Sequence, residues 1–178
     1  ITGNDRVGAV AMAGIRLATG DREDFERSAE RALEIEPLHP AVAAQIGYLF
    51  VLAGDWERGL PLIEEAIPDT AFVPGWYYSA HAFRYLQTGD YVQALDWALK
   101  IDAPRWFATP MTVAAAAGLA GRADLAAREA ARLIELDPEF RAAGRERLGG
   151  WGMNPGLQAR LIDGLEVNNL LSLHTAAN

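Results

Sequence analysis

A glycine followed by a charged residue recurs along this chain at nearly equal intervals, and this recurrence is its most constraining feature. The marks are Gly20-Asp21, Gly54-Asp55, Gly89-Asp90 and Gly121-Arg122, and successive glycines are 34, 35 and 32 positions apart. Each glycine lies between two stretches whose apolar residues follow helical spacing. The pattern predicts a repeated unit made of a helix, a glycine turn and a second helix.

The unit between residues 40 and 73 shows the repeat most clearly. Ile46-Gly47 and Phe50 occupy its first helix, whereas Gly59 and Ile63 occupy its second. Small residues at the facing positions of two helices permit a short interaxial distance that larger side chains would prevent. We therefore expect Gly47 and Gly59 to face each other across this helical hairpin.

The period and these positions resemble the tetratricopeptide repeat (TPR). The resemblance implies an all-α, right-handed TPR superhelix of helical hairpins with C-terminal capping helices. Four repeats are expected, at residues 6–39, 40–73, 74–104 and 106–138. With a capping helix they form a first region, residues 1–148. Residues 149–178 are expected to form a hinge, a short terminal helix that begins at Asn154-Pro155, and a polar tail.

Three further groups of residues extend the resemblance. Residues 74–78 (PGWYY) with Tyr85 and residues 88–95 form one group, and Trp106 with residues 114–122 forms another. Trp151, Asn154-Pro155 and residues 161–165 form the third. Together they resemble the C-terminal repeat region of bacterial class III adenylate/guanylate cyclases and of winged-helix regulators that carry TPRs. The chain departs from that family after Gly164-Leu165, where residues 166–169 (EVNN) replace a basic turn.

Composition excludes several classes of function. The net charge of −8 opposes nonspecific nucleic-acid binding, which needs a cationic surface. No cysteine is available for disulfides, thiolate catalysis or a cysteine-ligated zinc. No apolar run approaches the ~20 residues that span a bilayer. We expect no nucleic-acid partner for this segment, no membrane association and a cytoplasmic location.

The chain also lacks the motifs of common active sites. It contains no dinucleotide-binding, P-loop, nucleophile-elbow or zinc-protease motif. Its three histidines, His39, His81 and His174, share no metal-ligand spacing. His81 stands where the repeat usually buries an apolar residue, which favours a hydrogen-bonded core histidine over a ligand-binding one. We therefore expect a non-catalytic segment without cofactor or metal, although a parent protein could carry a cyclase domain.

The first helix of each repeat should line a concave groove in this architecture. Its inward positions are nearly uncharged and include Val10 and Gly14 in the first repeat. The groove residues predicted from the later repeats are Tyr48, Val51, Trp76, Ser79, Phe83, Leu86, Met111 and Leu119. An apolar groove of this kind suits a helix or an extended apolar segment of a partner. Ordinary packing between repeats is an equally weighted interpretation of the aromatic residues.

These residues predict a protein–protein interaction module, the regulatory part of a larger bacterial signalling protein such as a nucleotide cyclase. The expected partner is a protein or peptide segment. One alternative is a homo-oligomerisation scaffold for an attached output domain, and another is a small-molecule sensor. We also expect the groove to be filled by the tail leucines Leu170, Leu171 and Leu173, by a second copy, or by a captured peptide or small molecule.

Overall fold

The computed structural model describes residues 3–35, 39–67, 74–167 and 169–171. Ten α-helices and no β-strand occur in these residues, which confirms the predicted all-α class. The helices are α1 (Gly3–Ala18), α2 (Arg22–Ile35), α3 (Pro40–Leu52), α4 (Trp56–Ala66), α5 (Gly75–Thr88), α6 (Tyr91–Ala98), α7 (Ala108–Leu119), α8 (Ala123–Leu136), α9 (Phe140–Gly150) and α10 (Pro155–Glu166).

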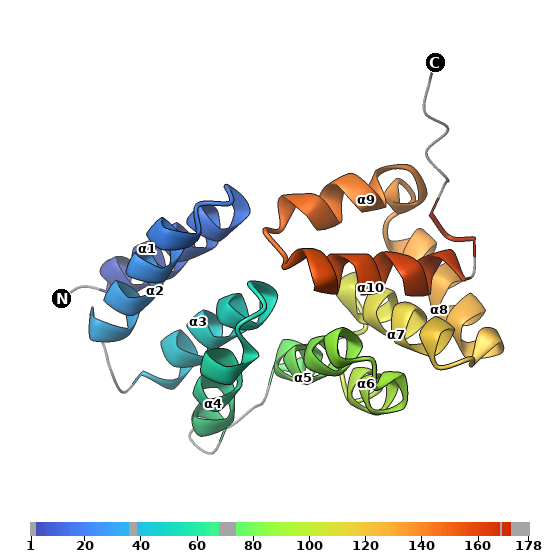
Figure 1. Ribbon diagram of the computed structural model, residues 1–178, viewed down its shortest axis with the longest axis horizontal. Helices are drawn as coiled ribbons and strands as arrows, with labels where there is room; N and C mark the ends of the chain where they lie inside the picture. Colours follow the sequence, from blue (N-terminus) through green and yellow to red (C-terminus); the bar gives the residue numbers. More distant parts are fainter. Residues whose placement is uncertain (1–2, 36–38, 68–73, 168, 172–178) are drawn as a thin grey trace.

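The first eight helices pack as four neighbouring pairs, and a glycine turn joins the two members of each pair (Figure 1). The turn glycines have φ of 78° at Gly20, 88° at Gly54, 82° at Gly89 and 72° at Gly121. An L side chain is strained at positive φ, so the recurring glycine is explained by backbone conformation. The predicted turns at all four positions are confirmed.

Aspartates after three of these glycines begin the second helix of the pair. The carboxylate of Asp55 accepts from the backbone N–H of Arg58 at 3.2 Å, and that of Asp90 accepts from the backbone N–H of Gln93 at 3.2 Å. Asp21 accepts from the backbone N–H of Asp24 at 3.0 Å. Each carboxylate thereby satisfies an N–H group that has no partner within the helix.

Gly47 and Gly59 bring the backbones of α3 and α4 together, as expected from the sequence. A Cβ atom added to Gly47 would lie 2.5 Å from the carbonyl oxygen of Gly59, and one added to Gly59 would lie 2.5 Å from that of Gly47. Both glycines are buried. No other residue fits either position without moving one of the two helices.

The C-terminal helices double back along the four pairs. In Figure 1 the pairs follow an arc from α1 to α8, and α10 runs along the side of that arc formed by α5 and α7. The buried residues of α10 are Leu157, Leu161, Gly164 and Leu165. Gly164 lies so close to the carbonyl group of Ala115 on α7 that a Cβ atom could not be accommodated. The terminal helix is therefore an integral part of the core.

The connection between α9 and α10 reaches back to the N-terminal half of the chain. Gly152, with φ of 65°, packs against the backbone of Leu17 at the end of α1. The backbone N–H of Asn154 donates to the carbonyl oxygen of Leu52 at 2.7 Å. Asn154 and Pro155 begin α10 as predicted, and the Asn154 side chain accepts from the N–H groups of Gly156 and Leu157. The segment predicted to be a hinge thus joins α1, α3 and α10.

Candidate functional site

A small apolar pocket opens where α1, α3 and α5 meet. Its volume is about 190 Å³, and we call it the Trp76 pocket. The lining residues are Val10, Gly14, Gln45, Tyr48, Leu49 and Trp76. Gln45 supplies the only polar side-chain amide of this set. The pocket can therefore hold an apolar group and offers it little beyond shape and dispersion contacts.

Two aromatic rings give this pocket its shape. The rings of Tyr48 and Trp76 meet edge to face, with centroids 5.2 Å apart and an interplanar angle of 69°. The ring centroid of Phe83 lies 6.2 Å from that of Tyr48, and the ring centroid of Tyr77 lies 4.3 Å from that of Trp76. Contacts of this geometry are favourable for aromatic pairs and restrict the motion of both rings. The wall of the pocket is consequently well supported.

The polar end of Tyr48 is satisfied inside the protein. Its hydroxyl lies 3.3 Å from the Ser79 hydroxyl, which donates to the carbonyl oxygen of Trp76 at 2.6 Å. Burial raises the pKa of Tyr48 to about 12, and the hydrogen bond with Ser79 opposes that shift. Tyr48 is thus neutral at physiological pH and presents a ring, not a charge, to the pocket.

Gly14 leaves open space on the α1 side of the pocket. A Cβ atom added there would meet no heavy atom within 4 Å outside its own helix. Glycine in a helix interior costs about 0.5–1 kcal/mol relative to alanine, and no packing contact at Gly14 requires it. The missing side chain therefore leaves room in the pocket next to α1.

The eight predicted groove residues occupy different environments in the structure. Tyr48 and Trp76 line the pocket, and Ser79 holds Tyr48 from behind. Leu119 on α7 is half-buried. The others are buried in the core: Val51, Phe83, Leu86 and Met111. Because α10 packs on α5 and α7, the open part of the predicted groove is its N-terminal end.

Sequence reasoning missed two residues of the pocket. Gln45 and Leu49 line the pocket but are absent from the predicted groove residues, and Leu49 directly follows the predicted Tyr48. The exposed Gln45 lies at the pocket rim, and Leu49 is half-buried. Helical spacing identifies the centre of a face, whereas the width of that face depends on how far the neighbouring helix stands off.

His81 lies outside the pocket, between α4 and α6. It is 8% exposed and stacks on Trp97 with ring centroids 4.1 Å apart. Its Nε2 atom lies 3.9 Å from Oε1 of Glu64, and burial lowers the pKa of the imidazole. These contacts place His81 in the packing between helices. Among the described residues, no three histidine or acidic side chains are grouped so that they could hold a metal ion.

No helix in the described part of the chain is both long and apolar enough to cross a membrane. No protein-family model matches this chain, and no curated protein matches it significantly.

Proposed function

We propose that this chain is a TPR-type interaction module that holds an apolar side chain of a partner segment in the Trp76 pocket. The observation that carries the proposal is an open apolar pocket walled by two supported aromatic rings where α1, α3 and α5 meet. The helix pairs with glycine turns 34, 35 and 32 residues apart support a TPR superhelix.

The volume of the pocket limits what can enter it. An apolar cavity of about 150 Å³ accommodates benzene, so a pocket of about 190 Å³ accepts one aromatic or branched aliphatic side chain. The rest of a partner segment would lie across the exposed rim of α1 and α3. One anchoring side chain in an apolar pocket, flanked by polar contacts, is a common arrangement in peptide recognition.

The test is a titration followed by amide NMR shifts of the labelled protein. The probes are the N-acetyl amides of phenylalanine, leucine and aspartate. We expect the first two to shift amides of α1, α3 and α5 with millimolar affinity, and the aspartate derivative to leave them unchanged. Gly14→Leu fills the pocket and should abolish the shifts. Gly8→Leu is the matched control, because Gly8 is equally open but does not line the pocket.

A small-molecule sensor is the second candidate, and the paired aromatic rings of Tyr48 and Trp76 in the pocket wall favour it. Free indole should then bind more tightly than N-acetyl-tryptophan amide, because the backbone of a peptide adds nothing to recognition. A partner segment predicts the reverse order, since its backbone contacts the rim. Equal shifts in the wild-type protein and in Gly14→Leu would contradict both candidates.

The regulatory role beside a cyclase or a winged helix rests on the sequence resemblance. Within a longer chain that carries a cyclase domain, Gly14→Leu should remove the response to the partner and leave basal activity intact. The purified segment by itself should turn over neither ATP nor GTP. Turnover that persists through repeated purification would contradict a non-catalytic module.

A further inference from the structure

We infer that the partner segment is an amphipathic helix with two apolar side chains four residues apart, one for the Trp76 pocket and one for a second pocket beside it. This inference rests on the proposed function, because it takes the Trp76 pocket as the first anchor site. The second pocket has a volume of about 430 Å³ and opens where α1 and α3 end, and we call it the turn pocket. Its apolar lining includes Leu17, Ala18, Gly20, Ala53, Met153 and Pro155.

The two pockets follow the same pair of helices. Gly14 of α1 lines the Trp76 pocket and Ala18 lines the turn pocket. The same step on α3 runs from Leu49 to Ala53. Four helical residues rise about 6 Å, so the edges of the two pockets lie about one turn apart on both helices. Two side chains four residues apart on a partner helix are separated by the same rise, and such a helix laid along α1 and α3 can place one in each pocket.

The chain itself binds a helix of this kind next to the turn pocket. The α10 helix packs on α5 and α7, and its buried leucines Leu157, Leu161 and Leu165 are also four residues apart. Its first residue, Pro155, forms part of the wall of the turn pocket. The second anchor of a partner helix would therefore contact the start of α10, and the partner would continue the surface that α10 already covers.

Backbone chemistry favours a helix over an extended segment. The α1 and α3 residues of the Trp76 pocket come from the interiors of these helices, where N–H and C=O groups are paired within each helix. An extended segment would find few partners there for its own backbone, whereas a helix satisfies its backbone groups internally. Small residues at Gly14 and Ala18 also allow a second helix to approach closely, and open space surrounds Gly14.

The charged and amide side chains of the turn pocket are already engaged within the chain. The Arg22 guanidinium donates to the carbonyl oxygen of Ala53 at 2.9 Å and pairs with Glu26 at 2.6 Å. The Asn154 side chain caps α10. The apolar wall is thus what the pocket offers to a partner, and the side chain that enters it should be apolar.

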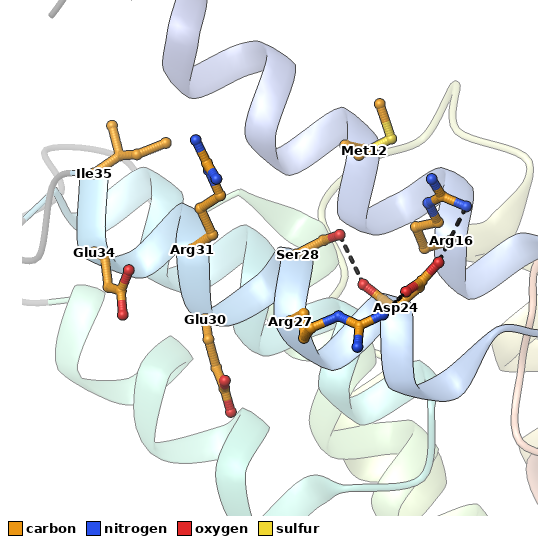
Figure 2. Close-up of a pocket in the computed structure, with 9 residues that line it drawn as sticks. All are labelled: Met12, Arg16, Asp24, Arg27, Ser28, Glu30, Arg31, Glu34 and Ile35. Atoms are coloured by element: carbon orange, nitrogen blue, oxygen red, sulfur yellow. Dashed lines mark hydrogen bonds and ion pairs between the residues drawn. The ribbon is translucent and has the colours of Figure 1, made fainter.

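A larger cavity of about 740 Å³ between α1 and α2 offers no such anchor sites (Figure 2). Helical spacing places it on the other side of α1 from the two pockets, and six of its nine lining residues are charged. Arg16 and Arg27 converge there on Asp24 from α1 and α2. An apolar helix face gains little on this surface, because the charges would lose water without gaining new partners.

The test uses three peptides of one alanine-rich helical host with equal numbers of lysine and glutamate, each added to the full chain. One peptide carries leucines at positions i and i+4, the second carries them at i and i+2, and the third carries a single leucine. We expect the i, i+4 peptide to bind at least about tenfold tighter than the other two, because a second buried leucine adds about that factor. It should shift amides of residues 17–20 and 153–154 as well as those of the Trp76 pocket.

Ala18→Leu separates the two anchor sites. Ala18 is exposed, so a leucine there fills part of the turn pocket without disturbing the core. This variant should bind the i, i+4 peptide no more tightly than the single-leucine peptide, and it should keep wild-type binding of N-acetyl-phenylalanine amide. Ala127→Leu is the matched control, because Ala127 is an exposed helical alanine of α8 that lines neither pocket. The control should leave the affinities of all three peptides unchanged.

Equal affinities of the i, i+4 and i, i+2 peptides would overturn the two-anchor helix. If N-acetyl-phenylalanine amide still bound in that case, the proposed function would stand with a single anchor, and if it did not bind, both proposals would fall. Shifts of the same amides on raising the concentration of the chain alone would identify a second copy as the occupant, and they would likewise overturn the inference.

Discussion

The backbone N–H of Asn154 donates to the carbonyl oxygen of Leu52 at 2.7 Å, across about a hundred residues of sequence. The same residue accepts at its side-chain oxygen from Nε2 of Gln87 at 3.3 Å. Asn154 thus ties the start of α10 to the end of α3 and to α5. Asn154 thereby helps to hold α10 against α5 and α7, where α10 covers part of the predicted groove.

Asn154→Ala should therefore cost more than the loss of an ordinary helix cap. Removing a cap costs about 1 kcal/mol. Here it also removes a partner of Gln87, whose Oε1 atom is already buried without a hydrogen bond. We expect a loss of about 2–3 kcal/mol in the free energy of unfolding, measured by urea denaturation. Asp90→Ala removes a cap alone and should cost about 1 kcal/mol. Equal losses for the two variants would show that the contact between the Asn154 side chain and Gln87 contributes nothing.

Gly59→Leu should overpack the contact between α3 and α4. The carbonyl oxygen of Gly47 occupies the space that the new side chain needs, so the helices must separate. We expect a destabilisation of at least ~1–3 kcal/mol, seen as a lower melting temperature. Gly8→Ala is the matched helical control, because open space surrounds Gly8. That substitution should stabilise the protein by about 0.5–1 kcal/mol.

His81 predicts a pH dependence of stability. Burial holds the pKa of its folded state below the ordinary value of 6.5, while Glu64 opposes that shift and Arg84 and Lys100 add to it. The contribution of the neutral His81 to the free energy of unfolding is fully present above pH 6.5. Below that pH the unfolded chain takes up a proton before the folded chain does, and stability falls by at most about 1.4 kcal/mol per pH unit.

The measurement is urea denaturation of the wild-type protein and His81→Phe from pH 8 to pH 5.5. Phenylalanine keeps an aromatic ring against Trp97 and removes the titrating group. The wild-type curve should decline over this range, and the variant should lose most of that slope. Parallel declines would assign the slope to other groups.

The sequence contained enough information to predict the helix pairs, because a glycine at positive φ and an aspartate cap are local requirements. Gly54 and Asp55 illustrate this: one needs only its own backbone conformation, and the other only the N–H three residues later. Asn154 and Pro155 were predictable as a helix start for the same reason.

The place of α10 was not predictable by such reasoning. Leu157, Leu161 and Leu165 follow a spacing of four and show that one face of α10 is buried, but that spacing does not identify the surface that buries it. The sequence likewise indicated that Phe83 and Met111 share the inward stripe with Trp76. Which part of that stripe stays open depends on a helix whose sequence lies more than forty residues away.

The described part of the tail packs against α9, whereas the sequence predicted that the tail fills the groove. Leu170 and Leu171 are buried, and a Cβ atom added to Gly144 on α9 would lie 2.9 Å from Cδ2 of Leu171. Arg141 of the same helix donates to the carbonyl oxygen of Asn169 at 2.9 Å. Leu173, the third predicted tail residue, lies outside the described residues.

Leu171→Ala should therefore destabilise the protein through α9 and leave the Trp76 pocket unchanged. Truncating a fully buried leucine costs about 2–5 kcal/mol, and the lower end applies here because Leu171 is near the end of the described chain. We expect a lower melting temperature with wild-type NMR shifts on titration with N-acetyl-phenylalanine amide. Trp76→Ala is the opposite case, since it should reduce probe binding by removing a wall of the pocket. If Leu171→Ala instead strengthened probe binding, the tail would compete for the pocket, and the contact with α9 would not be its main site.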